Sequence, residues 1–185
     1  MLRDSDGPMI CPVCDFPPGA DIWAPLLRID DPDLLLTLAC DFAEHVADLA
    51  PNPALYRFWL AATRAWRDDP GAARAAAAQA HTKAEEARGS VRTRRQTAKA
   101  KESEAMEAVA WATLAAGWLE AAQPERRMDL ETAGWSAIHS AQATADPAVE
   151  LGWQLAHVRE TACICRALLQ PLPEYPRSRR SLLAN

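Results

Sequence analysis

The segment from Gly134 to Val158 constrains the fold most, because it is a helical pattern interrupted once. The interruption is the Asp146-Pro147 pair, since proline cannot continue a helix that precedes it. Small residues recur before it and let a neighbouring helix approach closely: Ala137, Ser140, Ala141, Ala143 and Ala145. The larger side chains available for packing are Trp135, Ile138, Leu151, Trp153 and Leu155. The segment therefore predicts two packed helices in an all-α fold.

Helices are predicted along most of the remaining chain as well. Alanine makes up about a fifth of the 185 residues, and it favours helix because it loses no side-chain freedom there. Asp31-Pro32 and Asn52-Pro53 each combine a preferred N-cap with proline at the first helical position. With a break at Gly89-Ser90, the predicted helices are 31–49, 54–66, 72–88, 91–122, 125–145 and 147–169.

These helices predict a single-domain all-α bundle of about six helices over residues 31–170. Residues 1–30 contain five prolines, so we predict an irregular arm that carries a CPVC motif. Within it, the apolar side chains expected to lie along the bundle as extended chain are Trp23, Leu26, Leu27 and Ile29. Residues 171–185 hold further prolines and arginines and are predicted to form a loosely held tail.

Composition narrows the cellular setting. No run of 18 apolar residues is present, so a membrane span is not expected. The N-terminal sequence is acidic and lacks the apolar core of a signal peptide, which predicts a cytoplasmic protein. An odd number of cysteines, five, argues against a disulfide framework. The formal charge is −5, with ten acids and two bases in residues 1–50.

Cys11 and Cys14 are the candidate metal ligands. Two thiolates at CxxC spacing form half of a zinc knuckle, because the turn between them directs both sulfur atoms at one ion. The candidate partners that would complete the site are Cys163, Cys165 and His45. The alternative is that Cys11 and Cys14 form a reduced pair in the arm. Cys163 and Cys165 lie two apart on a predicted helix, so they face different sides and are interpreted as small core residues.

A basic stripe is the candidate partner-binding surface. Arg88, Arg92, Arg95 and Lys99 follow an i, i+4, i+7, i+11 spacing that lines one side of a helix. A cationic ridge of this kind can meet an acidic protein, and the alternative is a solvated face. Nucleic acid is not the expected partner, because the chain is acidic and no aromatic residue lies beside the stripe.

Catalytic signatures do not occur in the sequence: no phosphate loop, HExxH or GxSxG motif is present. An enzyme site between helices near His139 and His157 remains an alternative. The seven tryptophans are expected to be mostly core, and one or two on the surface would mark an interface.

Three segments resemble a known family: LACDFAEHVADL at 38–49, LAATRAWRDDPGAARAAAAQAH at 60–81 and AIHSAQATADPAVELGWQLAHV at 137–158. They are similar to the alanine-rich, all-helical immunity proteins of bacterial polymorphic toxin systems (the immunity-protein-five-like family). The resemblance implies a non-catalytic protein that neutralises a toxin by contact, with no catalytic residues to carry over.

The expected function is therefore that of a non-catalytic, immunity-like protein that occludes a partner such as a toxin. The expected contact surface is the basic stripe or the acidic N-terminal arm, with one or two tryptophan anchors. The first alternative is a small zinc-binding accessory subunit of an enzyme or assembly. The second is the helical-bundle enzyme with a site near His139 and His157.

Overall fold

Seven α-helices and one 3-10 turn form the described part of the chain, which comprises residues 21–91, 97–120 and 126–162 of a computed structural model. The elements in order are α1 (Trp23–Leu26), α2 (Pro32–His45), η1 (Ala47–Leu49), α3 (Pro53–Arg64), α4 (Pro70–Val91), α5 (Thr97–Glu120), α6 (Arg126–Ala143) and α7 (Pro147–Ala162). These residues include no strand, so the all-α prediction is confirmed. None of these helices combines the length and the hydropathy needed to span a bilayer.

The predicted N-caps set the starts of α2 and α3. The Asp31 carboxylate accepts hydrogen bonds from the backbone N–H groups of Asp33 (3.0 Å) and Leu34 (3.3 Å). The Asn52 side chain accepts one from the N–H of Leu55 at 3.3 Å. These bonds satisfy donors that the first turn of a helix leaves without intrahelical partners.

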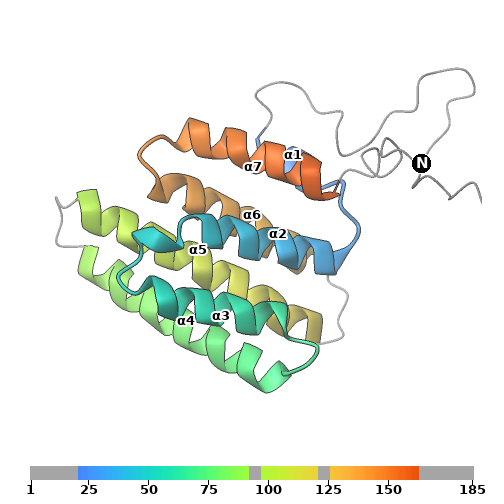
Figure 1. Cartoon of the computed structure of the whole chain (residues 1–185), viewed down its shortest axis with the longest axis horizontal. Helices are drawn as coiled ribbons and strands as arrows, with labels where there is room; N and C mark the ends of the chain where they lie inside the picture. Colours follow the sequence, from blue (N-terminus) through green and yellow to red (C-terminus); the bar gives the residue numbers. More distant parts are fainter. Residues whose placement is uncertain (1–20, 92–96, 121–125, 163–185) are drawn as a thin grey trace, which may run out of the picture.

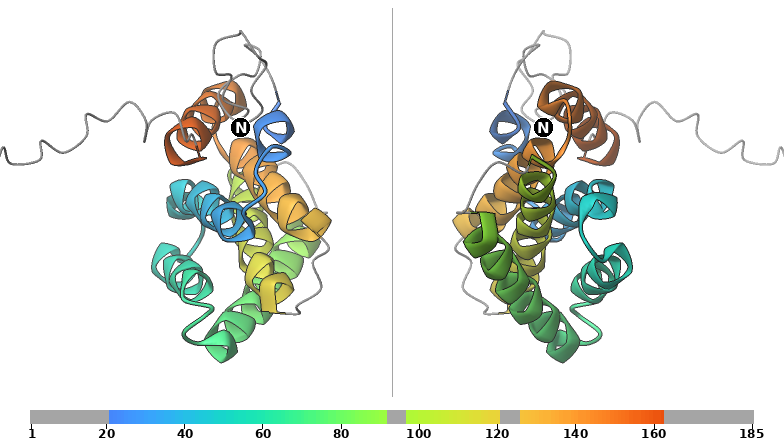
Figure 2. Two further views of the ribbon diagram at one scale, coloured as in Figure 1. Left: turned by 90° about the vertical axis from the view of Figure 1, so that its right-hand side faces the viewer. Right: turned by 90° about the vertical axis from the view of Figure 1, so that its left-hand side faces the viewer.

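The helices form two layers. In Figure 1, α7, α2 and α3 lie in front from top to bottom, and α6, α5 and α4 lie behind them. The side views in Figure 2 separate the same layers and place the short α1 beside α6 on the rear side. Helix α2, in the middle of the front layer, contacts both α5 and α6 of the rear layer.

Small residues bring the layers into contact, as the sequence predicted for the segment after Gly134. The hydroxyl of buried Ser140 donates to the carbonyl of Phe42 at 2.9 Å, and that of Ser136 donates to the carbonyl of Ala39 at 2.8 Å. Both bonds join α6 to the backbone of α2, and side chains this short permit such an approach. Phe42, Trp59 and Leu60 supply much of the bulk in the core.

Two predictions of local structure are wrong. Residues 23–26 form the short helix α1 rather than extended chain, with Leu26 and Ile29 buried and Leu27 exposed. Pro25 is compatible with this helix because the first turn makes no use of its backbone N–H. Helix α4 also continues through Gly89 and Ser90 to Val91, so this pair is not a break, and Val91 belongs to α4 rather than to the helix that contains Thr97–Glu120. Gly89 is exposed and does not end the helix.

Candidate functional site

The candidate zinc ligands Cys11, Cys14, Cys163 and Cys165 lie outside the described residues. Within the described ranges, no group of three or more His, Cys, Asp or Glu side chains is arranged to hold a metal ion. Cys40, which is fully buried, is no candidate, because burial raises its pKa from 9.0 to about 12. His45, the remaining candidate ligand, contacts the carboxylate of Glu150 at 3.0 Å. Zinc binding therefore stays a prediction that rests on the CPVC motif.

The basic stripe does not run along one helix. Arg88 lies near the end of α4, whereas Lys99 lies in the first turn of α5, and Arg92 and Arg95 fall outside the described residues. Arg88 is also engaged within the chain, with Glu85 at 2.7 Å and with the buried carboxylate of Glu107 at 2.6 Å. Of the predicted i, i+4, i+7, i+11 ridge, the described residues therefore place Arg88 and Lys99 on two different helices, and the rest of the ridge stays a prediction.

Lys99 lines a shallow hollow between α4 and α5. The hollow has a volume of about 280 Å³, and its polar lining includes Lys83, Glu86 and Glu102. Lys83 pairs with Glu86 at 2.6 Å, so positive and negative side chains alternate there. The balance of charge makes the hollow a poor match for the cationic surface that the sequence suggested.

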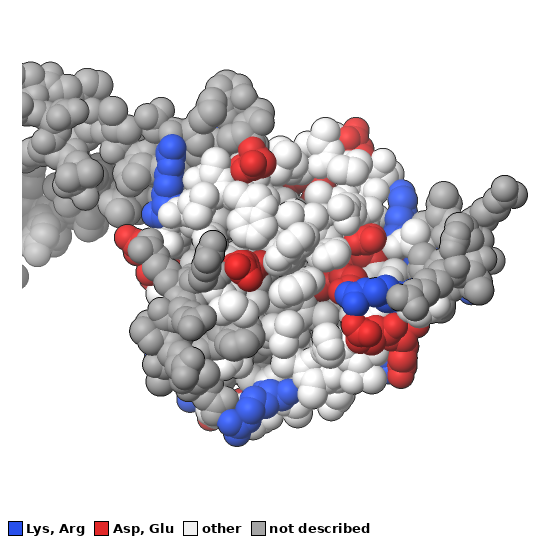
Figure 3. All heavy atoms as spheres, turned by 180° about the vertical axis from the view of Figure 1, so that it is seen from behind, with Lys and Arg blue, Asp and Glu red and all other residues white. Residues whose placement is uncertain are grey.

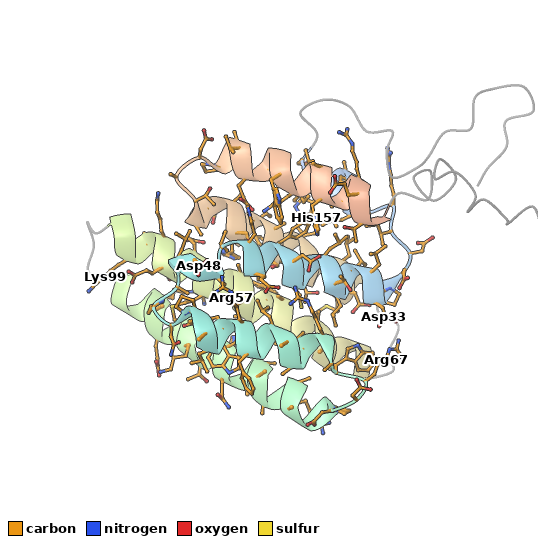
Figure 4. The ribbon with its side chains drawn as sticks, in the orientation of Figure 1. Asp33, Asp48, Arg57, Arg67, Lys99 and His157 are labelled. Atoms are coloured by element: carbon orange, nitrogen blue, oxygen red, sulfur yellow. The ribbon has the colours of Figure 1, made fainter. Side chains whose placement is uncertain are left out.

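The acids of α2 are largely compensated by the arginines of α3. Ion pairs join α2 and η1 to α3 and to the turn after it: Arg67 of this turn to Asp33, Arg64 to Asp41 (2.7 Å) and Glu44 (2.6 Å), and, from η1, Asp48 to Arg57 (2.8 Å). Figure 4 shows Asp48 beside Arg57 and Asp33 beside Arg67 on the front layer. These pairs are at least partly exposed and each adds little stability. They do compensate the charge of these four acids, whereas the acids of residues 1–20 lie outside the described part of the chain.

Two histidines attach α7 to α2. Nε2 of His157 lies 2.8 Å from the Asp41 carboxylate, and Nδ1 of His45 lies 3.0 Å from Glu150. The Trp153 indole stacks on both imidazoles, with centroid distances of 3.7 Å to His45 and 5.1 Å to His157. These contacts join helices, so His157 has a structural role here.

His139 lies elsewhere, between α6 and α5. Its Nδ1 is 2.7 Å from a carboxylate oxygen of Glu104, and its side chain is 19% exposed. The structure therefore separates His139 and His157 into different helix contacts. This separation does not support the single site that the enzyme alternative placed near them.

The outer surfaces of α1, α5 and α6 carry a cluster of aromatic rings centred on Trp135. The Trp135 ring meets Trp23 edge to face at 6.2 Å and lies 6.0 Å from Trp111 at an interplanar angle of 27°. It also lies 6.0 Å from the His139 ring. We call this surface the Trp135 face and define it by Trp23, Trp111, Trp135 and His139, together with Leu114 and Ile138, which lie one helical turn from Trp111 and Trp135.

Gly134 makes the Trp135 face possible. A Cβ atom at this position would lie 2.1 Å from the Trp23 ring, far inside van der Waals contact. The absence of a side chain lets the indole of α1 lie directly against the backbone of α6. Trp135 remains 39% exposed, although its ring is held by neighbours on both sides.

Among the residues that the structure describes, few charges interrupt this side of the molecule. Figure 3 views the rear layer and shows a largely uncharged surface, with isolated acids within it and lysines and arginines only toward its margins. An exposed tryptophan in an uncharged surface is typical of a protein interface. The sequence predicts one or two tryptophans on the surface, but no feature of it indicates that Trp135 is exposed while Trp59 is buried, with 2% exposure.

Comparison with known proteins adds no relative: no protein-family model, curated protein sequence or solved structure matches the chain.

Proposed function

We propose that this chain is a non-catalytic protein-binding domain that occludes a partner protein, with Trp135 as the central anchor of the contact. The observation that carries the proposal is the 39% exposure of Trp135, whose ring lies against Trp23 of α1 and Trp111 of α5. The resemblance to immunity proteins makes a toxin the first partner to test. We place the contact on the Trp135 face rather than on the basic stripe, whereas most of the acidic N-terminal arm lies outside the described residues.

The exposed part of Trp135 is large enough to matter for affinity. A tryptophan side chain offers about 150–250 Å² of surface, so the exposed fraction corresponds to roughly 60–100 Å². At about 25 cal/mol per Å², its burial contributes roughly 2 kcal/mol. Contacts with Trp23 and Trp111 restrict the ring before binding, which reduces the entropy lost on association.

The test uses the protein encoded next to this chain in its genome as the first candidate partner. Binding of the purified pair is measured by titration calorimetry for the native chain, Trp135→Ala and Phe58→Ala. Phe58 is a matched control, because it is an aromatic residue of α3, in the other layer, and is 67% exposed. Loss of roughly 2 kcal/mol predicts a Kd about 30-fold weaker for Trp135→Ala. Phe58→Ala should bind like the native chain.

Equal affinity of Trp135→Ala and the native chain for a bound partner would show that contact is made elsewhere. A catalytic effect of the chain on that partner at substoichiometric amounts would contradict the proposal of simple occlusion.

A further inference from the structure

We infer that the Trp135 face also binds a second copy of this chain, with the two α6 helices packed antiparallel across a two-fold axis at Trp135. This inference goes beyond the proposed function, because it requires the face but no outside partner. It rests on the order of charged and aromatic side chains along the outer row of α6.

The outer row of α6 contains an acid, a tryptophan and a histidine at regular spacing. Glu131, Trp135 and His139 are four residues apart, which places them along one row of the helix surface. Ser136 and Ser140 bond to α2 from the inner side, so Trp135 and Glu131 point away from the bundle. Glu131 and His139 are both partly exposed.

Two-fold symmetry makes this row complementary to itself. With the two-fold axis at Trp135, a residue four positions before Trp135 in one copy lies opposite the residue four positions after Trp135 in the other copy. Glu131 therefore faces His139 of the second copy. The contact occurs twice in the dimer. Packing i, i+4 rows against each other, at a crossing angle of about −50°, is the commonest helix–helix geometry. An ordinary crossing therefore brings these rows together.

The geometry around His139 suits a second carboxylate. Nδ1 of His139 already faces Glu104 of its own chain at 2.7 Å, so in the imidazolium form, in which both ring nitrogens carry a proton, Nε2 can donate to Glu131 of the other copy. The histidine would then link two carboxylates from different subunits. Glu104 is 32% exposed and lies beside the row, so it takes part without blocking it.

The face offers a row of apolar side chains on two helices. Helix α6 has 18 residues and is about 27 Å long, and Trp111 and Leu114 of α5 widen the apolar surface beside it. A specific interface needs roughly 800 Å² from each partner. A face with few charges can meet its own copy without like-charge repulsion. A dimer of this kind would cover Trp135 and compete with an outside partner.

Sedimentation velocity of the purified full chain from about 1 to 100 µM tests the inference, since interfaces of this size commonly bind in or below this range. The native chain should be dimeric at the upper concentrations. Glu131→Lys places a lysine opposite a histidine, and His139→Glu combined with Glu104→Gln places two carboxylates opposite each other. Each variant alone should dimerise at least tenfold more weakly. Phe58→Ala, on the other layer, should dimerise like the native chain.

An equimolar mixture of the two charge variants is the decisive sample. In the mixed dimer, the lysine introduced at position 131 of one chain faces the carboxylate introduced at position 139 of the other. The unchanged Glu131 of that second chain faces the unchanged His139 of the first. Dimerisation should therefore return toward the native level, which variants that had failed to fold could not do. Glu131→Gln, a milder change, should weaken the native dimer several-fold.

A native chain that stays monomeric at the highest concentration would overturn the inference. So would charge variants that dimerise as tightly as the native chain, or a mixture that shows no recovery. None of these samples contains an outside partner, so their outcome is independent of the proposed function.

Discussion

Replacing Gly134 with alanine tests the packing beneath the Trp135 face. On helix propensity alone, Gly134→Ala should stabilise the chain by about 1 kcal/mol, because glycine is the poorer residue in the interior of α6. The new Cβ atom, however, would lie 2.1 Å from two atoms of the Trp23 ring. The indole must move away, and α1 loses the contact that holds it against α6.

The free-energy cost of displacing Trp23 should exceed the gain in helix propensity from alanine. Removing a buried tryptophan costs about 3–5 kcal/mol, and displacement of the half-buried Trp23 should cost a little over half as much. The net result is a loss of about 1–2 kcal/mol, which lowers the Tm of a chain of this length by about 3–6 °C. Thermal unfolding followed by far-UV circular dichroism measures this shift.

A double-mutant cycle separates the two effects. In a Trp23→Ala background the clash is absent, so Gly134→Ala should now raise stability by up to about 1 kcal/mol. The sign of the alanine effect therefore reverses with the residue at position 23. A stabilised Gly134→Ala single variant would refute this account of α1 packing.

The other predictions concern burial and capping. Cys40 should not react with a thiol reagent at pH 8 in the native chain, and it should react once the chain unfolds, because burial raises its pKa from 9.0 to about 12. Its folded pKa lies above its unfolded value, so its contribution to stability is complete below pH 9 and is lost as the pH rises toward 12. Urea unfolding at a series of alkaline pH values should show that the free energy of unfolding falls less steeply with pH in Cys40→Ala than in the native chain. Equal slopes in the two proteins would contradict the raised pKa of Cys40. Asp31→Ala removes the cap of α2 and should cost about 1 kcal/mol, whereas the exposed Asp68→Ala should change little. Zinc analysis of protein purified without added metal should find about one ion per chain if Cys11 and Cys14 form a knuckle with further ligands, and none in Cys11→Ser/Cys14→Ser.

Local rules accounted for the helix starts and the close packing. Asp31 and Asn52 cap the helices that their sequences predicted, because capping depends only on residues within one turn. Small residues after Gly134 indicated a close contact, and Ser140 makes it with α2. Local rules fail at Gly89, because the helix-propensity cost of a single glycine is too small to end α4 there.

The candidate site could not be read from the sequence, since it depends on residues distant along the chain. His45 and Glu150 are 105 residues apart, and nothing local indicates that they meet. Trp135 and Trp59 both occupy helical positions, and only the packing of α1 and α5 beside α6 leaves the first exposed. The contact between His139 and Glu104 also depends on the tertiary arrangement, because the two residues belong to different helices.

Hydrogen exchange of the chain with and without its bound partner protein tests the central claim most directly. The account predicts slower exchange in the partner complex over 104–114 and 128–142, which carry most of the Trp135 face, and unchanged exchange over 53–64 in α3. Trp135→Ala should reduce the protection at the same partner concentration. Protection confined to α3, or to the charged pairs between α2 and α3, would contradict the account.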